Sequence, residues 1–537
     1  MPSQPAYHCL PNARITPVPT PRPAGRRNVS VGPRRDTRRP VGVQRKRAIH
    51  VISIAHSSGY ALRVTDEPTR KRRILVRSGK SPFDVASVEQ SLHRDVFATN
   101  AGNLIFSDAA HKLLSTPRTE VSSNGIRADP SAAERINEEY DVFVVPLANA
   151  FRPSFERPLK RMTQLIKKLR IPVVVLGVGA QADLKYNAAR LKPMEPTVRE
   201  FVTEVLNRSA SVGVRGEFTE QYLNAMGFRD VEVIGCPSMF MNGETFTLEK
   251  RVEALTSESR ISVNGSHSAV RSHGLDAIIR QAHARYPHLR FVGQNLLEAE
   301  LLHWRETAHP TGAQTSMPTH PSHPMYQEGK VRLYVDPATW IRELRAFDFS
   351  FGSRIHGNIA ALLAGVPSTV LCSDSRTLEL CRYFAIPHRK ISETPRNTDP
   401  AELYEAADFG DLVNGHKERF LRFTGFMEKN GLENAFTHGD GGAAFDARLA
   451  ELSLPPAVRP WVDSDPESLR GRFSFMQSRL DELTQQNAAL LSQLGARSRR
   501  VGFRGQGTDS ATALPAVYRR ARRVVGRPVK KLLRPDQ

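Results

Sequence analysis

Four short segments of this sequence combine cationic or amide side chains with glycine in a pattern that suits binding of a small anion. The most informative is FDFSFGSRIHGNIAALLAGVP at residues 347–367. A strand-like run leads to a polar turn with Ser353, Arg354 and His356, and Asn358 then opens an Ala/Leu-rich helix. Because the first N–H groups of a helix are unpaired and carry partial positive charge, an Arg and a His beside them make an anion site. An Arg paired with a carboxylate and a structural His would fit the same local pattern.

Two further segments place such residues where a predicted strand ends. GVGAQAD at 177–183 follows a fully apolar strand, so its glycines let the backbone approach a ligand, with Gly179 and Gln181 as candidates. SVGVRGEFTEQYL puts Arg215 and Glu217 at a strand-to-helix junction, where an Arg can clamp a carboxylate or phosphate. Locally, steric demands of a tight turn and an Arg–Glu pair explain these residues equally well.

The fourth segment, TNAGNLIFSDAAHKLLS, precedes an amphipathic helix. Asn100 and Asn103 flank a glycine at its start. An N-cap explains them locally, and the alternative is that their amides contact a ligand.

Taken together, these segments resemble the polysaccharide pyruvyltransferase family in order and spacing. The resemblance rests on FATNAGNLIFSDAA, DVFVVPLANAFRP, IPVVVLGVGAQAD, SVGVRGEFTEQYLNAMG with VIGCPS, and FGSRIHGNIAALLAGVPSTVL followed by DSRTLELCRYFAIP. It covers roughly residues 48–450, and the GSRIHGN and VRGE blocks are its most specific parts. It does not extend to the two ends of the chain.

The resemblance implies two Rossmann-like domains similar to the GT-B arrangement, with the donor held between them. It also implies transfer of a pyruvyl group from phosphoenolpyruvate to sugar hydroxyls of a cell-envelope polysaccharide or glycolipid, which forms a ketal. The donor site implied uses Arg215, Arg354 and His356. No cofactor is expected besides this donor substrate.

Ketal formation needs an acid, a base and groups that stabilise phosphate. We assign His356 as phosphate ligand and general acid, beside the two arginines. Glu217, Asp374 and Glu379 are candidates for the base because they follow predicted strand ends, and Glu217 joins His356 and Arg354 in the predicted catalytic set.

The elements that must position these residues alternate between strand and helix. Two buried strands, at 141–147 and 171–179, flank a helical pattern from Phe155 to Leu169, and this alternation specifies a parallel α/β sheet. A first strand-like run spans Ala48 to Ala55, and another spans Arg73 to Val76. A second set of strands is predicted near Ile261–Asn264, Leu289–Gly293, Val331–Tyr334 and Thr369–Leu371, around helices at about 270–285, 337–346 and 357–365.

Composition divides the chain into five parts. They are a disordered basic arm (1–47), an N-terminal α/β domain (48–245), a C-terminal α/β domain (246–460), a coiled coil (466–496) and a basic tail (497–537). The ligand cleft is expected at the boundary between the two α/β domains, where periodicity is lost around 240–260.

The formal net charge of +21 comes almost entirely from the two ends. Residues 1–47 carry eleven Lys/Arg and one Asp, and residues 497–537 carry twelve Lys/Arg and two Asp. A nearly neutral body argues against nucleic-acid binding, which needs a dense basic stripe on the fold itself.

A heptad pattern follows residue 460. Its apolar or seam positions are Leu469, Phe473, Met476, Leu480, Leu483, Asn487, Leu490 and Leu494. Asn487 at an a-type position favours a parallel homodimer in one register. The alternative is an amphipathic helix packed on its own domain.

Cysteine usage and hydropathy indicate a cytoplasmic protein. Cys9, Cys236, Cys372 and Cys381 are too few and scattered for a disulfide framework, and no secretory signal or membrane span is visible. The tail from Tyr518 to Leu533 mixes Lys and Arg with Val and Leu, which suits an anionic membrane surface, so we expect peripheral attachment at the inner membrane face. The alternative is a solvated tail.

Metal binding is not expected, because no cluster in the predicted cleft has ligand spacing. His309, His320 and His323 lie in a Pro/His/Thr-rich loop that we interpret as solvated. Two other function classes stay open: a nucleotide-sugar glycosyltransferase of GT-B type, and a non-catalytic envelope scaffold.

Overall fold

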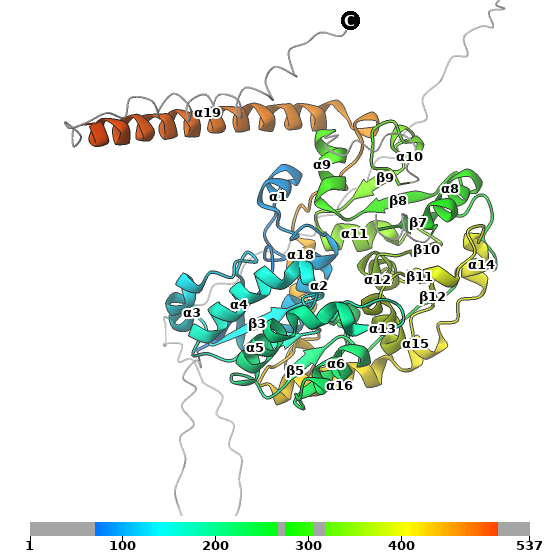
Figure 1. The fold of residues 1–537 in the computed structure, drawn as a ribbon. Helices are drawn as coiled ribbons and strands as arrows, with labels where there is room; N and C mark the ends of the chain where they lie inside the picture. Colours follow the sequence, from blue (N-terminus) through cyan, green and yellow to red (C-terminus); the bar gives the residue numbers. More distant parts are fainter. Residues whose placement is uncertain (1–69, 267–273, 306–316, 503–537) are drawn as a thin grey trace, which may run out of the picture. The chain divides into compact units, whose positions relative to one another are not determined.

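Two parallel β-sheets and the helices around them organise the chain (Figure 1). The computed structural model describes residues 70–266, 274–305 and 317–502. The strands are β1 (Arg72–Val76), β2 (Thr119–Ser123), β3 (Val142–Pro146), β4 (Val173–Leu176), β5 (Val212–Val214), β6 (Val231–Val233), β7 (Ile261–Asn264), β8 (Arg290–Gly293), β9 (Val331–Leu333), β10 (Phe349–Gly352), β11 (Ser368–Cys372) and β12 (His388–Lys390).

All pairings between these strands are parallel. The first sheet has the order β2-β1-β3-β4, and a parallel bridge from Val178 to Val214 leads on to the pair β5-β6. The second sheet has the order β12-β11-β10-β7-β8-β9. Parallel α/β architecture, predicted from the alternation of strand and helix, is thereby confirmed. The predicted strand Ala48–Ala55, like the arm 1–47 and the tail from residue 503 onward, lies outside the described residues.

Helices connect the strands of the first sheet. They are α1 (Val88–Arg94), α2 (Gly102–Leu114), α3 (Ala133–Glu139), α4 (Glu156–Lys168), α5 (Glu195–Leu206) and α6 (Glu217–Ala225). Helix α4 confirms the predicted helix between β3 and β4, and its buried side chains include Leu159, Met162 and Ile166 at spacings of three and four. All residues of β3 and β4 are buried, as expected for parallel strands covered on both faces.

The second sheet is built the same way. Its helices are α8 (Leu275–Arg285), α9 (Leu296–Trp304), α10 (Pro324–Gln327), α11 (Pro337–Leu344), α12 (Ile355–Leu363), α13 (Ser375–Phe384) and α14 (Pro400–Glu405). Asp336 starts α11 by accepting the N–H groups of Ala338 and Thr339, and Pro337 occupies the first helical position. The predicted helix at 357–365 begins two residues earlier than expected, at Ile355.

The chain then returns to the first sheet through α15 (Gly410–Asn414), α16 (His416–Lys429), α17 (Ala435–His438) and α18 (Ala443–Ala450). Asn430, at the end of α16, accepts the N–H of Ala210 at 3.0 Å and donates to Ser211 Oγ at 3.1 Å. Lys112 forms an ion pair with Asp446 at 2.7 Å. Helices within the predicted second domain, 246–460, therefore pack against the first sheet, a return that the strand and helix periodicity did not indicate.

Helix α2 lies at the centre of this arrangement. Every residue from Leu104 to Leu114 is buried, and Ile105, Phe106 and Ala110 share one core cluster with Trp340 and Ile359 of α11 and α12. An apolar core therefore joins the two sheets through α2, and the first turn of α2 is brought close to α12.

The predicted heptad forms one continuous helix, α19 (Pro466–Gly502; orange to red in Figure 1). Arg472 anchors its first turns by donating to Ser464 Oγ at 2.9 Å and to the carbonyl of Arg459 at 3.2 Å. Among the described helices, none combines the length and apolar character required to cross a membrane.

Candidate functional site

Arg215 is a buried cation that has no counter-charge in hydrogen-bonding contact among the described residues. It directly follows β5, its backbone N–H bonds to the carbonyl of Val178 at 2.8 Å, and its side chain is 1% exposed. Its Nε and Nη2 have no hydrogen-bond partner in the described part of the chain. Burial lowers the pKa of this guanidinium. A buried charge with unpaired donors is costly, so the site is suited to receive an anion.

Glycines and a buried carboxyl surround Arg215. A Cβ at Gly179 would lie 3.4 Å from both Arg215 Cδ and Glu379 Oε1, and a Cβ at Gly216 would lie 2.8 Å from Glu379 Cβ. The absence of a side chain at these two positions thus lets the loops after β4 and β5 close around the pair. Gly179, predicted as a ligand contact, lies beside Arg215 as a packing residue.

Glu379 is the carboxyl at this centre. It is 3% exposed and accepts the backbone N–H of Thr219 at 3.0 Å and the Thr219 hydroxyl at 2.9 Å. Burial raises its pKa to about 7, against the lowering effects of the Thr219 hydrogen bonds and the Arg215 charge. Glu379 can therefore gain or lose a proton near neutral pH, which is the property of a general acid or base.

Asp374, the second candidate base, is held in an ion pair. It accepts the N–H of Thr377 at the start of α13 and pairs with Arg376 at 2.5 Å. Burial raises its pKa, but the Arg376 charge and these hydrogen bonds outweigh burial and bring the pKa below its usual value. Gln181 donates to Asp374 at 3.5 Å, which places this predicted ligand contact at the same edge.

Glu217 lies apart from these carboxyls. It is the first residue of α6 and its side chain is exposed. The sequence placed it correctly at the strand-to-helix junction, but the side chain that faces Arg215 from across the junction is Glu379, from α13.

His356 lies in the first turn of α12 and not in the loop before it. It is 7% exposed, its Nε2 is 3.7 Å from Cys236 Sγ, and its ring centroid is 6.0 Å from that of Phe106. A Cβ at Gly102, the first residue of α2, would lie 2.7 Å from His356 Cβ. Burial, reinforced by the charges of Arg215 and Arg376, lowers the pKa of His356 to about 3. The imidazole is therefore neutral at pH 7.

Arg354 is the N-cap residue of α12. Its backbone N–H bonds to Asn264 Oδ1 at 2.8 Å, its Nε bonds to the carbonyl of Gly265 at 3.2 Å, and its side chain is partly exposed. Burial lowers its pKa. Ser353 accepts the N–H of Ser266 through its hydroxyl at 3.0 Å. Both residues border the start of α12, as predicted.

Asn358 holds this turn together. Its amide nitrogen donates to the carbonyls of Gly352 (3.1 Å) and Arg354 (3.0 Å), and its oxygen accepts from Ser368 at 2.9 Å. It is fully buried, so its amide groups are occupied by protein partners. Asn358, predicted as a substrate contact, therefore lies behind Arg354 and holds the turn that positions it.

Asn100 and Asn103 are likewise engaged with the backbone. Asn100 Oδ1 accepts the N–H of Gly102 at 2.9 Å, and Asn103 donates to the carbonyl of Phe97 at 3.1 Å. They shape the start of α2, but neither is its N-cap: that residue is Ala101, and no side chain in the described part of the chain caps the helix. Asn103 additionally lines a small cavity with Phe106.

That small cavity, of about 100 Å³, contains residues that the sequence motifs did not reveal. Arg77 follows β1 and Arg152 follows β3 by a few residues, and both line the cavity. Asn149, in the amide orientation that suits its neighbours, accepts from Arg152 Nη1 at 2.5 Å and from Arg376 Nη1 at 2.7 Å. The sequence signal that could have identified Arg77 and Arg152 was their position after predicted strands, since ligands bind at the carboxyl ends of parallel strands.

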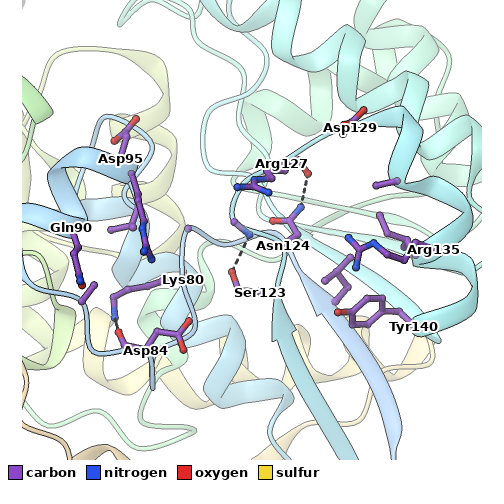
Figure 2. A pocket seen from close by; sticks show the side chains of 18 of the residues that line it. Lys80, Asp84, Gln90, Asp95, Ser123, Asn124, Arg127, Asp129, Arg135 and Tyr140 are labelled. Carbon is purple, nitrogen blue, oxygen red and sulfur yellow. Dashed lines mark hydrogen bonds between the residues drawn. The ribbon is translucent and has the colours of Figure 1, made fainter. Parts of the chain in front are cut away.

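A larger cavity, of about 770 Å³, adjoins the small one through Gly79 and Val96. Figure 2 shows its lining from two stretches: the segment after β1, with Lys80, and the segment from β2 to α3, with Arg127 and Tyr140. Its lining is about equally polar and apolar, and neither Arg215 nor His356 belongs to it.

No group of three or more His, Cys, Asp or Glu side chains suited to a metal occurs within residues 70–266, 274–305 and 317–502.

Comparison with known proteins gives one family match. A family described as polysaccharide pyruvyl transferase matches residues 100–375, a span that contains Arg215, Arg354 and His356. No curated protein sequence matches this chain.

Several solved structures are similar at low identity. A putative UDP-N-acetylglucosamine 2-epimerase from Listeria monocytogenes is 12% identical, with 72% of this chain and 99% of that chain covered at a TM-score of 0.35. The UDP-GlcNAc 2-epimerase from Methanocaldococcus jannaschii is 12% identical, with coverage of 71% and 99% and a TM-score of 0.32. A glycosyltransferase from Streptomyces nogalater is 12% identical, with coverage of 72% and 100% and a TM-score of 0.26. These scores are too low to assign a fold.

Proposed function

We propose, because the chain belongs to the polysaccharide pyruvyl transferase family, that it transfers the pyruvyl group of phosphoenolpyruvate to two hydroxyls of one glycan or glycolipid sugar. The observation that carries this proposal is Arg215, a buried guanidinium whose Nε and Nη2 lack partners among the residues that the structure describes. Phosphoenolpyruvate is a small anion with a carboxylate and a phosphate, and both accept hydrogen bonds from guanidinium groups.

The donor would lie between the two sheets. Arg215 comes from the end of β5, whereas Arg354 and His356 come from the start of α12 after β10. Phe106 links the two sides, because its ring centroid is 6.0 Å from the Arg215 guanidinium carbon and 6.0 Å from the His356 ring. Convergence of residues from both halves supports a GT-B-like pair of Rossmann-like domains.

The reaction has two bond-forming steps. A proton adds to the methylene carbon of phosphoenolpyruvate, and the first sugar hydroxyl bonds to the adjacent carbon as it loses its proton. The carbon–oxygen bond to phosphate then breaks, and the second hydroxyl bonds to the same carbon while its proton passes to phosphate. The products are inorganic phosphate and a cyclic ketal, and the ketal retains the carboxylate.

The sequence placed the general acid at His356, but burial lowers the pKa of His356 to about 3, so we assign the proton transfer at carbon to Glu379 instead. Its pKa of about 7 allows the carboxyl to hold the proton before transfer and to accept one from the attacking hydroxyl afterwards. His356 is neutral at pH 7 and can donate a hydrogen bond to phosphate, and the negative charge of a bound donor would raise its pKa. Arg215 and Arg354 stabilise the carboxylate and the departing phosphate.

A coupled assay of phosphate release tests this function. Purified protein is incubated with phosphoenolpyruvate and envelope glycan from cells that lack the gene, and mass spectrometry follows the pyruvyl ketal. We expect phosphate and ketal in equal amounts, loss of both with Arg354→Ala, and impairment with Arg354→Lys, because an ammonium cannot reproduce the planar fork.

Transfer of a sugar from a nucleotide diphosphate donor, with no ketal, would instead establish the glycosyltransferase alternative. Absence of binding to either donor would favour the scaffold.

We further propose that the protein is a homodimer joined through α19. Phe473, Met476, Leu480 and Leu483 are between 41% and 58% exposed there, at alternating spacings of three and four. A second copy of the same helix would cover this stripe. Cytoplasmic location and attachment to the inner membrane face through the tail remain proposals that rest on the sequence.

A further inference from the structure

We propose that the small cavity between Arg77 and Arg152 is a subsite for an anionic group of the acceptor, a phosphate or carboxylate attached to the sugar. This inference rests on the proposed pyruvyl transfer, and it adds the chemical class of the acceptor.

Arg77 is the first cation at this subsite. It follows the last residue of β1, and its backbone N–H bonds to the carbonyl of Val144 in β3 at 2.9 Å. Its Nε is enclosed and has no hydrogen-bond partner among the described residues. Burial lowers its pKa to about 10.

Arg152 is the second cation. Its Nη1 donates to the carbonyl of Asn149 at 2.7 Å, its Nε donates to Ser154 Oγ at 3.0 Å, and its guanidinium carbon lies 5.3 Å from the centre of the Phe155 ring. These contacts fix the guanidinium in place without neutralising it. Burial lowers its pKa to about 10, and the charge of Arg376 acts in the same direction.

Neither arginine has a carboxylate within ion-pair distance in the part of the chain that the structure describes. Both buried cations line this cavity, so an anion bound there would compensate their charges. The cavity volume of about 100 Å³ leaves room for a phosphate or carboxylate group.

The position of the cavity favours the acceptor over the donor. Phe106 lines the cavity and also contacts the region of Arg215 and His356. An anion at Arg77 and Arg152 would therefore lie one aromatic ring away from the donor. In the proposed reaction, Arg215, Arg354 and His356 bind the carboxylate and phosphate of the donor. The second pair of cations, Arg77 and Arg152, is therefore available to bind another molecule.

The larger cavity gives the rest of the acceptor a place to extend. Gly79 and Val96 border both cavities, and the larger one is lined by polar side chains that include Lys80, Asn124 and Arg127 (Figure 2). A glycan anchored by its anionic group can make hydrogen bonds along this surface.

Isothermal titration calorimetry on the full-length protein tests the subsite. Glucose 1-phosphate, glucuronate and glucose are titrated with and without saturating phosphoenolpyruvate, so that phosphate, carboxylate and neutral sugar are compared. We expect one or both anionic sugars to bind and glucose to bind at least tenfold more weakly, since a charge-assisted hydrogen bond is worth about 1.5–3 kcal/mol.

Arg77→Gln and Arg152→Gln should each weaken the anionic sugar by about tenfold or more and leave the affinity for phosphoenolpyruvate unchanged. Arg157→Gln is the matched control. Arg157 is exposed on α4, so this substitution removes the same charge outside the cavity. Arg215→Gln should show the reverse pattern, with the donor lost and the anionic sugar retained.

Equal binding of all three sugars would overturn the subsite, and so would variants at Arg77 and Arg152 that bind like wild type. Loss of phosphoenolpyruvate in these two variants would assign the cavity to the donor instead. If phosphoenolpyruvate fails to bind while the anionic sugars bind in a manner that depends on Arg77 and Arg152, the donor assignment is wrong and the anion subsite stands.

Discussion

Replacement of Arg215 by methionine should stabilise the empty protein while it destroys donor binding. Arg215 is 1% exposed, and its Nε and Nη2 lack partners among the described residues. Each unsatisfied buried donor costs about 1–3 kcal/mol, so the gross cost of two is roughly 2–6 kcal/mol. Methionine has a similar length and no charge, and exchange of a buried charge for a well-packed apolar group often stabilises by about 1–4 kcal/mol.

We therefore expect the Arg215→Met variant to gain about 2 kcal/mol in the free energy of unfolding, because imperfect packing of methionine offsets part of the gross figure. In a thermal scan this corresponds to a rise in Tm of a few degrees. Phosphoenolpyruvate at about 100 times its Kd should raise the free energy of unfolding of wild type by about 2.7 kcal/mol. It should leave the free energy of unfolding of the variant unchanged.

The assay is thermal unfolding of both proteins with and without phosphoenolpyruvate, and Arg157→Met serves as control for the charge change at an exposed site. A variant that is less stable than the empty wild type would refute the claim that Arg215 is an uncompensated charge. Continued stabilisation of the variant by phosphoenolpyruvate would refute its assignment to the donor.

Three further predictions concern protons and assembly. Burial lowers the pKa of both His356 and His111 to about 3, so below pH 6.5 the unfolded chain binds more protons than the folded protein. The free energy of unfolding should therefore fall as pH drops from about 6.5 toward 3, by about 1.4 kcal/mol per pH unit for each histidine. Chemical denaturation of His111→Gln should show a weaker dependence of this free energy on pH. Glu379→Gln should lower kcat and remove the ionisation near pH 7 from the pH–rate profile, with donor affinity retained; an unchanged profile would exclude Glu379. Light scattering should find a dimer for the full chain and a monomer after removal of residues 466–496, and a monomeric full chain would contradict the pairing of α19.

The sequence by itself determined the local elements and the motif residues. Apolar spacing between Phe155 and Leu169 identified α4, and the SRIHG block placed Arg354 and His356 in a turn directly before a helix, which begins two residues earlier than predicted. These features depend on neighbours within one element, and periodicity records such neighbours directly. The alternation of elements was likewise sufficient for a parallel α/β architecture.

Only the tertiary structure decided which side chains face each other. Glu379 bonds to Thr219 from another helix and lies near Arg215, whereas Glu217, beside Arg215 in the chain, is exposed. Arg77 and Arg152 follow different strands and meet at one cavity because the two strands pair in parallel and end at the same edge. Such meetings depend on sheet order and on burial, and burial also sets the pKa of Glu379 and His356. No spacing along the chain carries that information, because desolvation is a property of the packed whole.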